Sequence, residues 1–324
     1  MAHDPTRPAP TSTAQVAARP DPLRPPCGDP TTLADGSAPG AGAGTAATAP
    51  VLGPDCWFLS GPTAAGKSDL AVELARELGA EVLSVDSMAV YRGLDVGTAK
   101  PTPDQRRAVP HHLLDLVAPA EPFSVAAWLA AAAATVADVR GRGRRVLFVG
   151  GTPLYLRALR DGLAALPPAD PGARAALVAE AARVGPAALH DRLAQIDPAA
   201  AARIHPRDLK RIIRGLEVAQ ATGRPLSAAF APSAHPVFES QLLVVDLPRR
   251  LLRERIDRRV ERMFAGGIGP TARQAAGYAE AIDLLAGRID RAEAIRRTQA
   301  RTRQLAKRQL TWLRSFPRAI WLAV

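Results

Sequence analysis

The feature that most constrains this chain is residues 61–68, GPTAAGKS, which fit the pattern G-x-x-x-x-G-K-[ST] at every position. The apolar residues 56–60 before it predict a buried strand, and residues 68–78 after it carry Leu and Ala at helical spacing. A strand, a glycine-containing loop and a helix start therefore follow one another in the order that a phosphate-binding loop requires.

The residue types of this loop suit an anion. Gly61 and Gly66 let the backbone turn with its N–H groups pointing inward, and these donors act together with the positive end of the helix dipole. Lys67 adds a positive charge, and the Ser68 hydroxyl is a ligand for Mg²⁺. The loop by itself does not distinguish among ATP, GTP and a prenyl diphosphate.

Two further polar residues follow predicted buried strands. Asp86 ends the apolar stretch 81–85, and Thr152 follows residues 145–149. Ligands of open α/β sheets bind beyond the carboxyl ends of the strands, so both residues are expected beside the phosphate loop. Asp86 is interpreted as a general base or Mg²⁺ partner, with a helix N-cap as the alternative. Thr152, with Pro153 after it, is expected to cap a helix and also to contact a ligand.

The chain is predicted to divide into three parts. Residues 1–54 are rich in Pro, Ala and Gly without apolar periodicity, which predicts a disordered extension. Residues 55–160 and 239–324 predict an α/β core with a parallel sheet, and residues 161–238 predict an inserted all-helical domain. Basic helices are expected at 249–264 and 291–314.

Composition limits the class of protein. With 324 residues, 47% of them hydrophobic, the chain has ample material for a core, but no apolar run is long enough to span a bilayer. The N-terminus lacks the apolar centre of a secretory signal, and its aspartates argue against a transit peptide. The two cysteines, Cys27 and Cys56, are too few for a disulfide framework or a zinc site. A cytoplasmic protein is therefore expected.

The positive charge is concentrated near the C-terminus. Residues 249–318 contain 18 Lys and Arg against 7 Asp and Glu, an excess equal to the net charge of +11 of the whole chain. Such a block predicts a polyanionic partner, most simply a nucleic acid, with arginine on solvated helix faces as the alternative.

Two shorter stretches have interpretations of their own. Thr98 and Lys100 lie in a loop rich in Gly and polar residues, where they are expected to face an anion. The adjacent His111 and His112 point different ways on any regular element, so they are interpreted as structural or contact residues rather than ligands of one metal.

Six stretches together resemble one family. They are GPTAAGKS at 61–68, DSMAVY at 86–91, GTAKP at 97–101, HHL at 111–113, GGT at 150–152 and TRQLAKRQLTW at 302–312. In this order they resemble the bacterial tRNA dimethylallyltransferase (tRNA isopentenyltransferase) family, and the resemblance runs from about residue 58 to residue 322.

The resemblance implies transfer of a prenyl group from dimethylallyl diphosphate to the exocyclic amine of the adenosine 3′ of the tRNA anticodon, with release of diphosphate. The fold implied is a P-loop nucleotide-hydrolase-like core. The phosphate loop would bind the diphosphate leaving group, and fixed positive charge at the leaving oxygens would be the largest catalytic contribution. The catalytic residues implied are Asp86, which accepts the proton of the amine, Lys67, Thr152 and Arg259. The diphosphate-binding residues implied are Gly61, Thr63, Ala64, Ala65, Gly66, Lys67 and Ser68, with Ser68 also the ligand of Mg²⁺.

The same resemblance implies contacts with the anticodon stem-loop of tRNA, whose target base is splayed out of a single strand. For Trp312, stacking on a base and packing in the core both remain open. The tRNA-binding residues implied are Asp86, Ser87, Met88, Ala89, Thr152, Arg174, Lys210, Arg211, Arg214, Gln274, Gly277, Tyr278, Lys307, Arg308, Gln309, Trp312 and Arg314.

Some features depart from the family pattern. Residues 263–271 look shortened where relatives carry a further helix, and Ala279 stands where a basic residue is common. Three rival functions fit parts of the sequence: a small-molecule kinase using ATP, an adenylate isopentenyltransferase acting on free nucleotides, and a non-catalytic RNA-binding protein. The protein is expected to be a monomer without a membrane partner.

Overall fold

The computed structural model describes residues 52–164, 166–229, 238, 240–265 and 277–324. The predicted disordered extension lies almost entirely outside them, as do Gln274 and most of the shortened segment.

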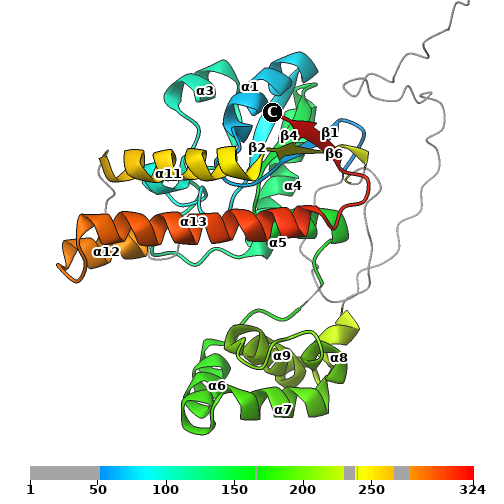
Figure 1. Cartoon of the computed structure of the whole chain (residues 1–324). Helices are drawn as coiled ribbons and strands as arrows, with labels where there is room; N and C mark the ends of the chain where they lie inside the picture. Colours follow the sequence, from blue (N-terminus) through cyan, green and yellow to red (C-terminus); the bar gives the residue numbers. More distant parts are fainter. Residues whose placement is uncertain (1–51, 165, 230–237, 239, 266–276) are drawn as a thin grey trace, which may run out of the picture. The chain divides into compact units, whose positions relative to one another are not determined.

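The described residues contain one sheet of six parallel strands in the order β3-β2-β4-β1-β5-β6 (Figure 1). The predicted α/β class with a parallel sheet is confirmed. The strands are β1 (Cys56–Ser60), β2 (Ala80–Val85), β3 (His111–His112), β4 (Arg145–Gly150), β5 (Leu242–Asp246) and β6 (Ile320–Ala323).

Both faces of this sheet are buried because its central strands are apolar at successive positions. Phe58 of β1 stands opposite Phe148 of β4, and their rings stack on one face with centroids 5.2 Å apart. Leu59 and Leu147, which alternate with them, belong to the core of the other face.

Helices cover each face. The core on the Phe58 side includes residues of α4 (Val125–Gly141) and α5 (Pro153–Asp161). The core on the Leu59 side includes residues of α1 (Lys67–Leu78) and α11 (Arg249–Ala265), and α13 (Arg291–Leu313) packs against α11 (Figure 1). The apolar stripe of α11 is buried; it consists of Leu252, Ile256, Val260 and Met263.

The stretch predicted to be a helical insertion contains no strand among its described residues. Its elements are α6 (Pro171–Val184), α7 (Pro186–Ile196), α8 (Pro198–Ala201), α9 (Leu209–Thr222) and the 3₁₀ turn η1 (Leu226–Ala229). They share a core of their own, in which Leu193 and Ile212 are fully buried. The proposed domain boundaries stay a prediction.

Several short elements were not predicted. They are β3, β6, α2 (Asp95–Thr98), α3 (Pro103–Ala108) and α12 (Tyr278–Leu285). The two histidines of β3 are used within the protein: His111 Nδ1 lies 2.7 Å from the Val109 carbonyl oxygen, and His112 Nε2 lies 2.6 Å from the Glu81 carboxylate. No described helix has the length and apolar character needed to cross a membrane.

Candidate active site

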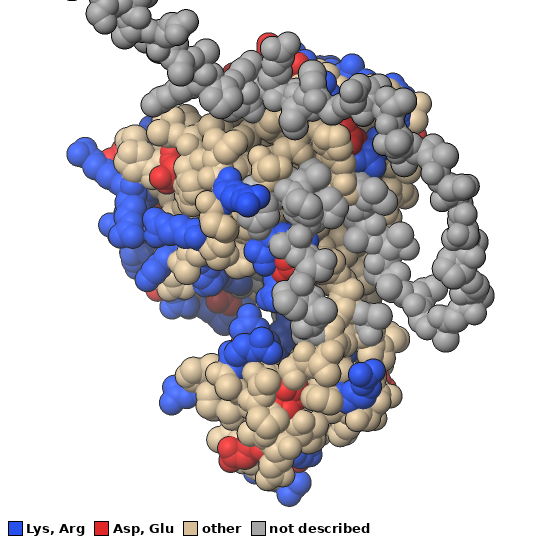
Figure 2. Space-filling model, turned by 90° about the vertical axis from the view of Figure 1, so that its right-hand side faces the viewer, with Lys and Arg blue, Asp and Glu red and all other residues tan. Residues whose placement is uncertain are grey.

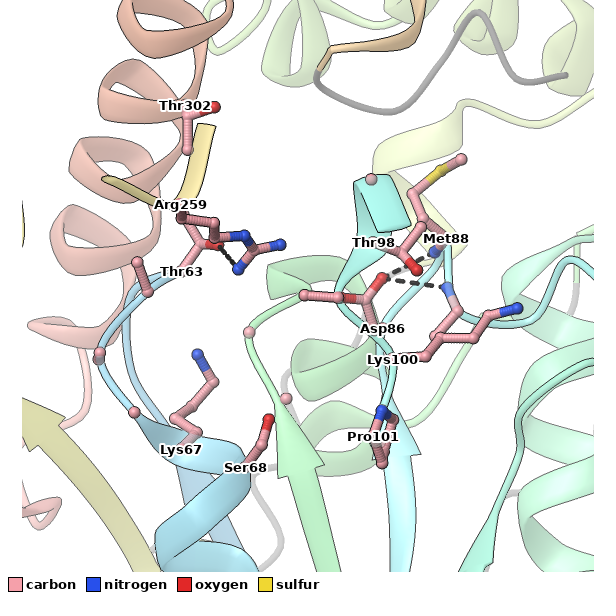
Figure 3. Close-up of a pocket in the computed structure, with 18 of the residues that line it drawn as sticks. Thr63, Lys67, Ser68, Asp86, Met88, Thr98, Lys100, Pro101, Arg259 and Thr302 are labelled. Atoms are coloured by element: carbon pink, nitrogen blue, oxygen red, sulfur yellow. Dashed lines mark hydrogen bonds between the residues drawn. The ribbon is translucent and has the colours of Figure 1, made fainter. Parts of the chain in front are cut away.

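A cavity of about 1160 Å³ opens at the carboxyl ends of the central strands. Its walls come from the phosphate loop, the turn after β2, the loop around Thr98, the segment after β4, and helices α11 and α13 (Figure 3). The fold therefore brings the phosphate loop, Asp86, Thr152 and Arg259 to one cavity, while their roles stay a prediction.

The phosphate loop has the backbone that its glycines allow. Gly66 has a φ of 93° where α1 begins, a conformation that favours glycine. Gly61 is packed closely under the neighbouring strand, since a Cβ there would lie 2.9 Å from the Val245 carbonyl oxygen. The Lys67 ammonium donates to the carbonyl oxygens of Gly61 and Pro62, at 3.0 and 2.8 Å, and so closes the loop on itself.

Lys67 is held in an environment that disfavours its charge. Burial, together with the nearby Arg259 guanidinium, lowers the pKa of its ammonium to about 8, while Asp86 acts in the opposite direction. An anion in the loop would relieve this penalty, because an opposite charge within a few ångströms favours the ammonium form.

Helix α11 adds two arginines to the loop. Arg259 Nη1 donates to Thr63 Oγ1 at 3.1 Å, and Arg255 Nη1 donates to the Ala65 carbonyl oxygen at 3.2 Å. Burial also lowers the pKa of Arg259, but a guanidinium remains charged under all ordinary conditions. Arg255 was not predicted from the sequence, although it stands four residues before Arg259 and hence on the same helix face.

Asp86 begins a turn and faces the cavity (Figure 3). Its Oδ1 accepts from the N–H groups of Met88 and Ala89, at 2.8 and 3.3 Å. No helix starts there, since α2 begins only at Asp95, so the helix N-cap alternative is wrong. One carboxylate oxygen shapes the turn, and no described residue is hydrogen-bonded to Oδ2, which can accept a proton.

Thr152 corrects a second expectation. It stands at the N-cap position of α5 but makes no capping hydrogen bond with its side chain. Its Oγ1 instead accepts from the Ser87 N–H at 3.1 Å, which ties the segment after β4 to the turn that carries Asp86.

Lys100 does not present a free charge to the cavity, contrary to the expectation that it faces an anion. Its ammonium donates to the Tyr91 carbonyl oxygen at 2.6 Å and pairs with the carboxylates of Asp95 and Asp115, at 2.8 and 2.5 Å. Its side chain is only 1% exposed. The neighbouring Thr98 hydroxyl donates to the Leu94 carbonyl oxygen and lines the cavity.

The residues implied to bind tRNA fall into different environments. Arg174 and Arg214 pair with Glu217, and Arg211 pairs with Asp208. Lys210 is exposed, and no ion pair is found for it within the described part of the chain.

Lys307 and Arg308 of α13, and Arg314 directly after it, are exposed and likewise make no ion pair with a described residue. Figure 2 shows Lys and Arg side chains gathered over part of the surface. Trp312 is half-buried, with its ring edge-on to Phe316 at 4.4 Å between centroids, so one part of it packs and another remains accessible.

Two other implied tRNA contacts are buried. Tyr278 accepts a hydrogen bond at its hydroxyl from the Gly97 N–H, at 3.3 Å, and directly follows Gly277 at the start of α12. The side-chain amide of Gln309 accepts from the Thr63 N–H and donates to the Gly151 carbonyl oxygen. Tyr278 and Gln309 are thus committed to contacts inside the protein.

The loop also fits the ion that its sequence implies. The Ser68 hydroxyl lies at the start of α1, beside the anion-binding backbone, and lines the cavity. No cluster of three His, Cys, Asp or Glu that could bind a metal occurs among the described residues. A single hydroxyl suits Mg²⁺, which takes most of its ligands from phosphate and water.

Comparisons with known proteins decide the family. A family model described as IPP transferase matches residues 89–316, and one described as isopentenyl transferase matches residues 54–115. The tRNA dimethylallyltransferase of Anaeromyxobacter dehalogenans strain 2CP-C is 50% identical over 281 residues, which cover 82% of this chain and 94% of the relative. The chain belongs to the tRNA dimethylallyltransferase family.

Other members of the family are also similar to this chain. The tRNA dimethylallyltransferase of Salinispora tropica is 47% identical over 81% of this chain and 86% of its own. The solved tRNA isopentenylpyrophosphate transferase of Bacillus halodurans is 38% identical, with a TM-score of 0.56 over 83% of this chain and 89% of its own. A eukaryotic dimethylallyltransferase structure, 24% identical with a TM-score of 0.67 over 82% of this chain and 73% of its own, shares the fold. Nothing in these comparisons supports a kinase or an enzyme acting on free nucleotides.

Proposed function

We propose that the protein transfers the dimethylallyl group of dimethylallyl diphosphate to the exocyclic amine of the adenosine that follows the tRNA anticodon. A bond forms between the amine nitrogen and the prenyl carbon, and the bond from that carbon to the diphosphate oxygen breaks. The amine loses one proton, and diphosphate leaves. The observation that carries the proposal is that a carboxylate, Asp86, and a cationic phosphate loop face the same cavity.

The phosphate loop would bind the diphosphate end of the donor. Its backbone N–H groups and the start of α1 attract the anion, and Lys67 would exchange its carbonyl partners for diphosphate oxygens. Arg259, already on the loop through Thr63, would add a second charge where negative charge develops on the leaving oxygen. Mg²⁺ bound through Ser68 would supply further neutralisation of the diphosphate.

Asp86 would act at the other end of the reacting bond. Its Oδ1 is used by the turn, so Oδ2 would accept the proton of the amine as the new bond forms. Thr152 fixes this turn through Ser87. The exposed cations of α13 would bind the phosphates of the anticodon stem-loop. Because tRNA is the substrate, we place the enzyme in the cytoplasm; the monomeric state stays a prediction.

The test is a transfer assay with labelled dimethylallyl diphosphate, Mg²⁺ and unmodified tRNA, with AMP as a parallel acceptor. Label should enter tRNA alone. Asp86→Asn keeps an oxygen for the turn but removes the base, so we expect the rate to fall about 10²–10⁴-fold. Lys67→Met should weaken donor binding.

The matched control is Asp246→Asn, because Asp246 also ends a strand of this sheet but does not line the cavity. The transfer rate of Asp246→Asn should equal that of the wild-type protein. Label in AMP alone would indicate a free-nucleotide enzyme, and ATP turnover without prenyl transfer would indicate a kinase. Full activity in Asp86→Asn would remove the proposed base.

A further inference from the structure

Gln309 is a buried polar residue at the junction of three segments that are distant in sequence. Its Oε1 accepts from the Thr63 N–H at 2.9 Å, 246 positions away in the phosphate loop. Its Nε2 donates to the Gly151 carbonyl oxygen at 2.8 Å, in the segment after β4. Both ends of one amide are therefore used, and the residue is only 7% exposed on a helix whose other polar residues are mostly more exposed.

The packing at Gly151 shows how close these segments are. A Cβ at this position would lie 2.6 Å from Gln309 Nε2 and 2.9 Å from the Gly61 carbonyl oxygen. Real Cβ atoms do not approach other atoms so closely, and the Gly61 oxygen belongs to rigid backbone. The phosphate loop, the Gly151 segment and α13 meet here with no room for a methyl group.

Each hydrogen-bond partner of Gln309 is connected to a different side of the cavity. Thr63 receives the hydrogen bond of Arg259 and belongs to the loop that would bind diphosphate. Gly151 precedes Thr152, whose hydroxyl binds the Ser87 N–H next to Asp86. The amide of Gln309 thus joins the leaving-group side of the cavity to the side that carries the base.

We propose that Gln309 is a positioning residue that fixes the distance between the phosphate loop and the Asp86 turn, and that it does not contact tRNA. The inference rests on the proposed function. Reactions in which two groups must be held in line are sensitive to misplacement, and about 1 Å can cost 10²-fold in rate. The amide would therefore contribute to the transfer step rather than to RNA affinity.

The main test is Gln309→Met, which keeps the side-chain length and removes both hydrogen bonds. We expect its single-turnover transfer rate at saturating substrates to fall at least tenfold. The dissociation constant for an unmodified anticodon stem-loop, measured by fluorescence anisotropy, should stay within twofold of the wild-type value. Lys307→Ala, on the exposed face of the same helix, should weaken binding of the stem-loop.

A second variant perturbs the same junction from its other side. Gly151→Ala introduces the methyl group that Gln309 Nε2 excludes, so it should give the same loss of rate without loss of RNA affinity. If both act through one junction, the double variant should be little slower than either single variant, because coupled residues are not additive. If the two substitutions acted independently, their fold losses in transfer rate would multiply.

The matched control for loss of a buried glutamine is Gln241→Met. Gln241 is 6% exposed and donates to the Pro54 carbonyl oxygen, outside the cavity lining. It should keep the wild-type rate although its thermal stability falls. An equal loss of rate in Gln241→Met would mean that the effect of Gln309→Met comes from a general loss of stability, and it would overturn the proposal.

Two outcomes separate the inference from the proposed function. Calorimetric titration with inorganic diphosphate and Mg²⁺ should show at least fivefold weaker binding in Gln309→Met, since Thr63 is released. Unchanged diphosphate affinity and transfer rate, or a tenfold weaker affinity for RNA at an unchanged rate, would overturn the inference. Absence of prenyl transfer by the wild-type protein would overturn the proposed function, and the diphosphate titration would still test the contact of Gln309 with the phosphate loop.

Discussion

Thr152 Oγ1 accepts a hydrogen bond from the Ser87 N–H at 3.1 Å, although Thr152 occupies the N-cap position of α5. The bond crosses from the segment after β4 to the turn after β2, and these two strands are adjacent in the sheet. The bond restrains the backbone next to Asp86, because Ser87 is the following residue in the chain. A hydroxyl at this position therefore matters for the base as well as for any ligand.

The first prediction concerns that hydroxyl. Thr152→Val keeps the shape of the side chain and leaves the Ser87 N–H without its acceptor, so the Asp86 turn should loosen. We expect the transfer rate to fall about 10–100-fold, as a small misplacement of a catalytic group does. Thr152→Ser keeps the hydroxyl and should retain most of the activity. Equal rates for Thr152→Val and Thr152→Ser, measured in single turnovers, would contradict this role.

The second prediction uses the depressed pKa of Lys67, about 8 in the free protein. Below this pH the ammonium is charged and can bind diphosphate, whereas above it the free protein loses the charge. Bound diphosphate favours the ammonium, so binding above pH 8 must include proton uptake and should weaken progressively. Titration calorimetry of diphosphate from about pH 7 to about pH 9.5, which brackets this pKa, measures the effect.

Lys67→Met is the control, because it cannot titrate. The ionisation of diphosphate itself affects both proteins equally, so the difference between their pH profiles reports Lys67. Parallel pH profiles of the two proteins would mean that Lys67 titrates outside this pH range or does not contact the anion.

The central architecture could be predicted from sequence because its signals are local. Residues 56–60 form β1 with the predicted bounds, since apolar runs flanked by turn residues specify buried strands. The strand β3 lacks such a signal, and the apolar run of β6 was not predicted to be a strand. The first is only two histidines, and the second, Ile320–Ala323, is a half-exposed strand at the sheet edge, whose pairing with β5 depends on the finished fold.

Several residues predicted for the site line the cavity, but their hydrogen-bond and ion-pair partners could not be predicted from the sequence. Capping rules use neighbours in sequence, so they assigned Thr152 to its own helix, whereas its partner is 65 positions away. Lys100 was assigned to a ligand because nothing local shows that Asp115 will neutralise it. Gln309 was assigned to tRNA binding by the family resemblance, which does not show its partners Thr63 and Gly151. Long-range partners of polar side chains are properties of the fold.

The third prediction concerns RNA binding by α13. Lys307, Arg308 and Arg314 are exposed without an ion pair to any described residue, so their charges are available to phosphates. Substituting all three by Ala should weaken stem-loop binding and reduce the slope of log Kd against log salt by about 0.7 for each phosphate that is no longer neutralised. Anisotropy titrations between 50 and 200 mM salt, roughly the range where this dependence is large, measure both effects.

Arg296 and Arg297 provide a control on the same helix. Both pair with Glu293, at 2.6 Å each, so one of their two positive charges is already balanced within the protein. Their replacement by Ala should change the salt slope much less. An unchanged slope in the triple variant would remove α13 from the RNA-binding surface.

The last prediction separates two roles of Lys100. As the structure has it, the buried ammonium holds the loop around α2 through two carboxylates and the Tyr91 carbonyl oxygen. Burial opposes ionisation of Asp115, but Lys100 and Arg106 outweigh it and lower the pKa of that carboxyl. The stabilisation is therefore present above the ordinary Asp pKa of about 3.8 and is lost as the pH falls through the lower value of the folded protein.

Lys100→Met should lower the free energy of unfolding by about 2–4 kcal/mol in urea denaturation at pH 7, because it leaves carboxylates without their buried partner. Arg107→Met removes an ion pair with Asp104 that is exposed on both sides, so its effect should stay below about 1 kcal/mol. If Lys100 instead bound an anion, Lys100→Met would weaken diphosphate binding at undiminished stability. A large loss of stability with unchanged diphosphate affinity in the folded variant would identify Lys100 as a structural cation of this loop.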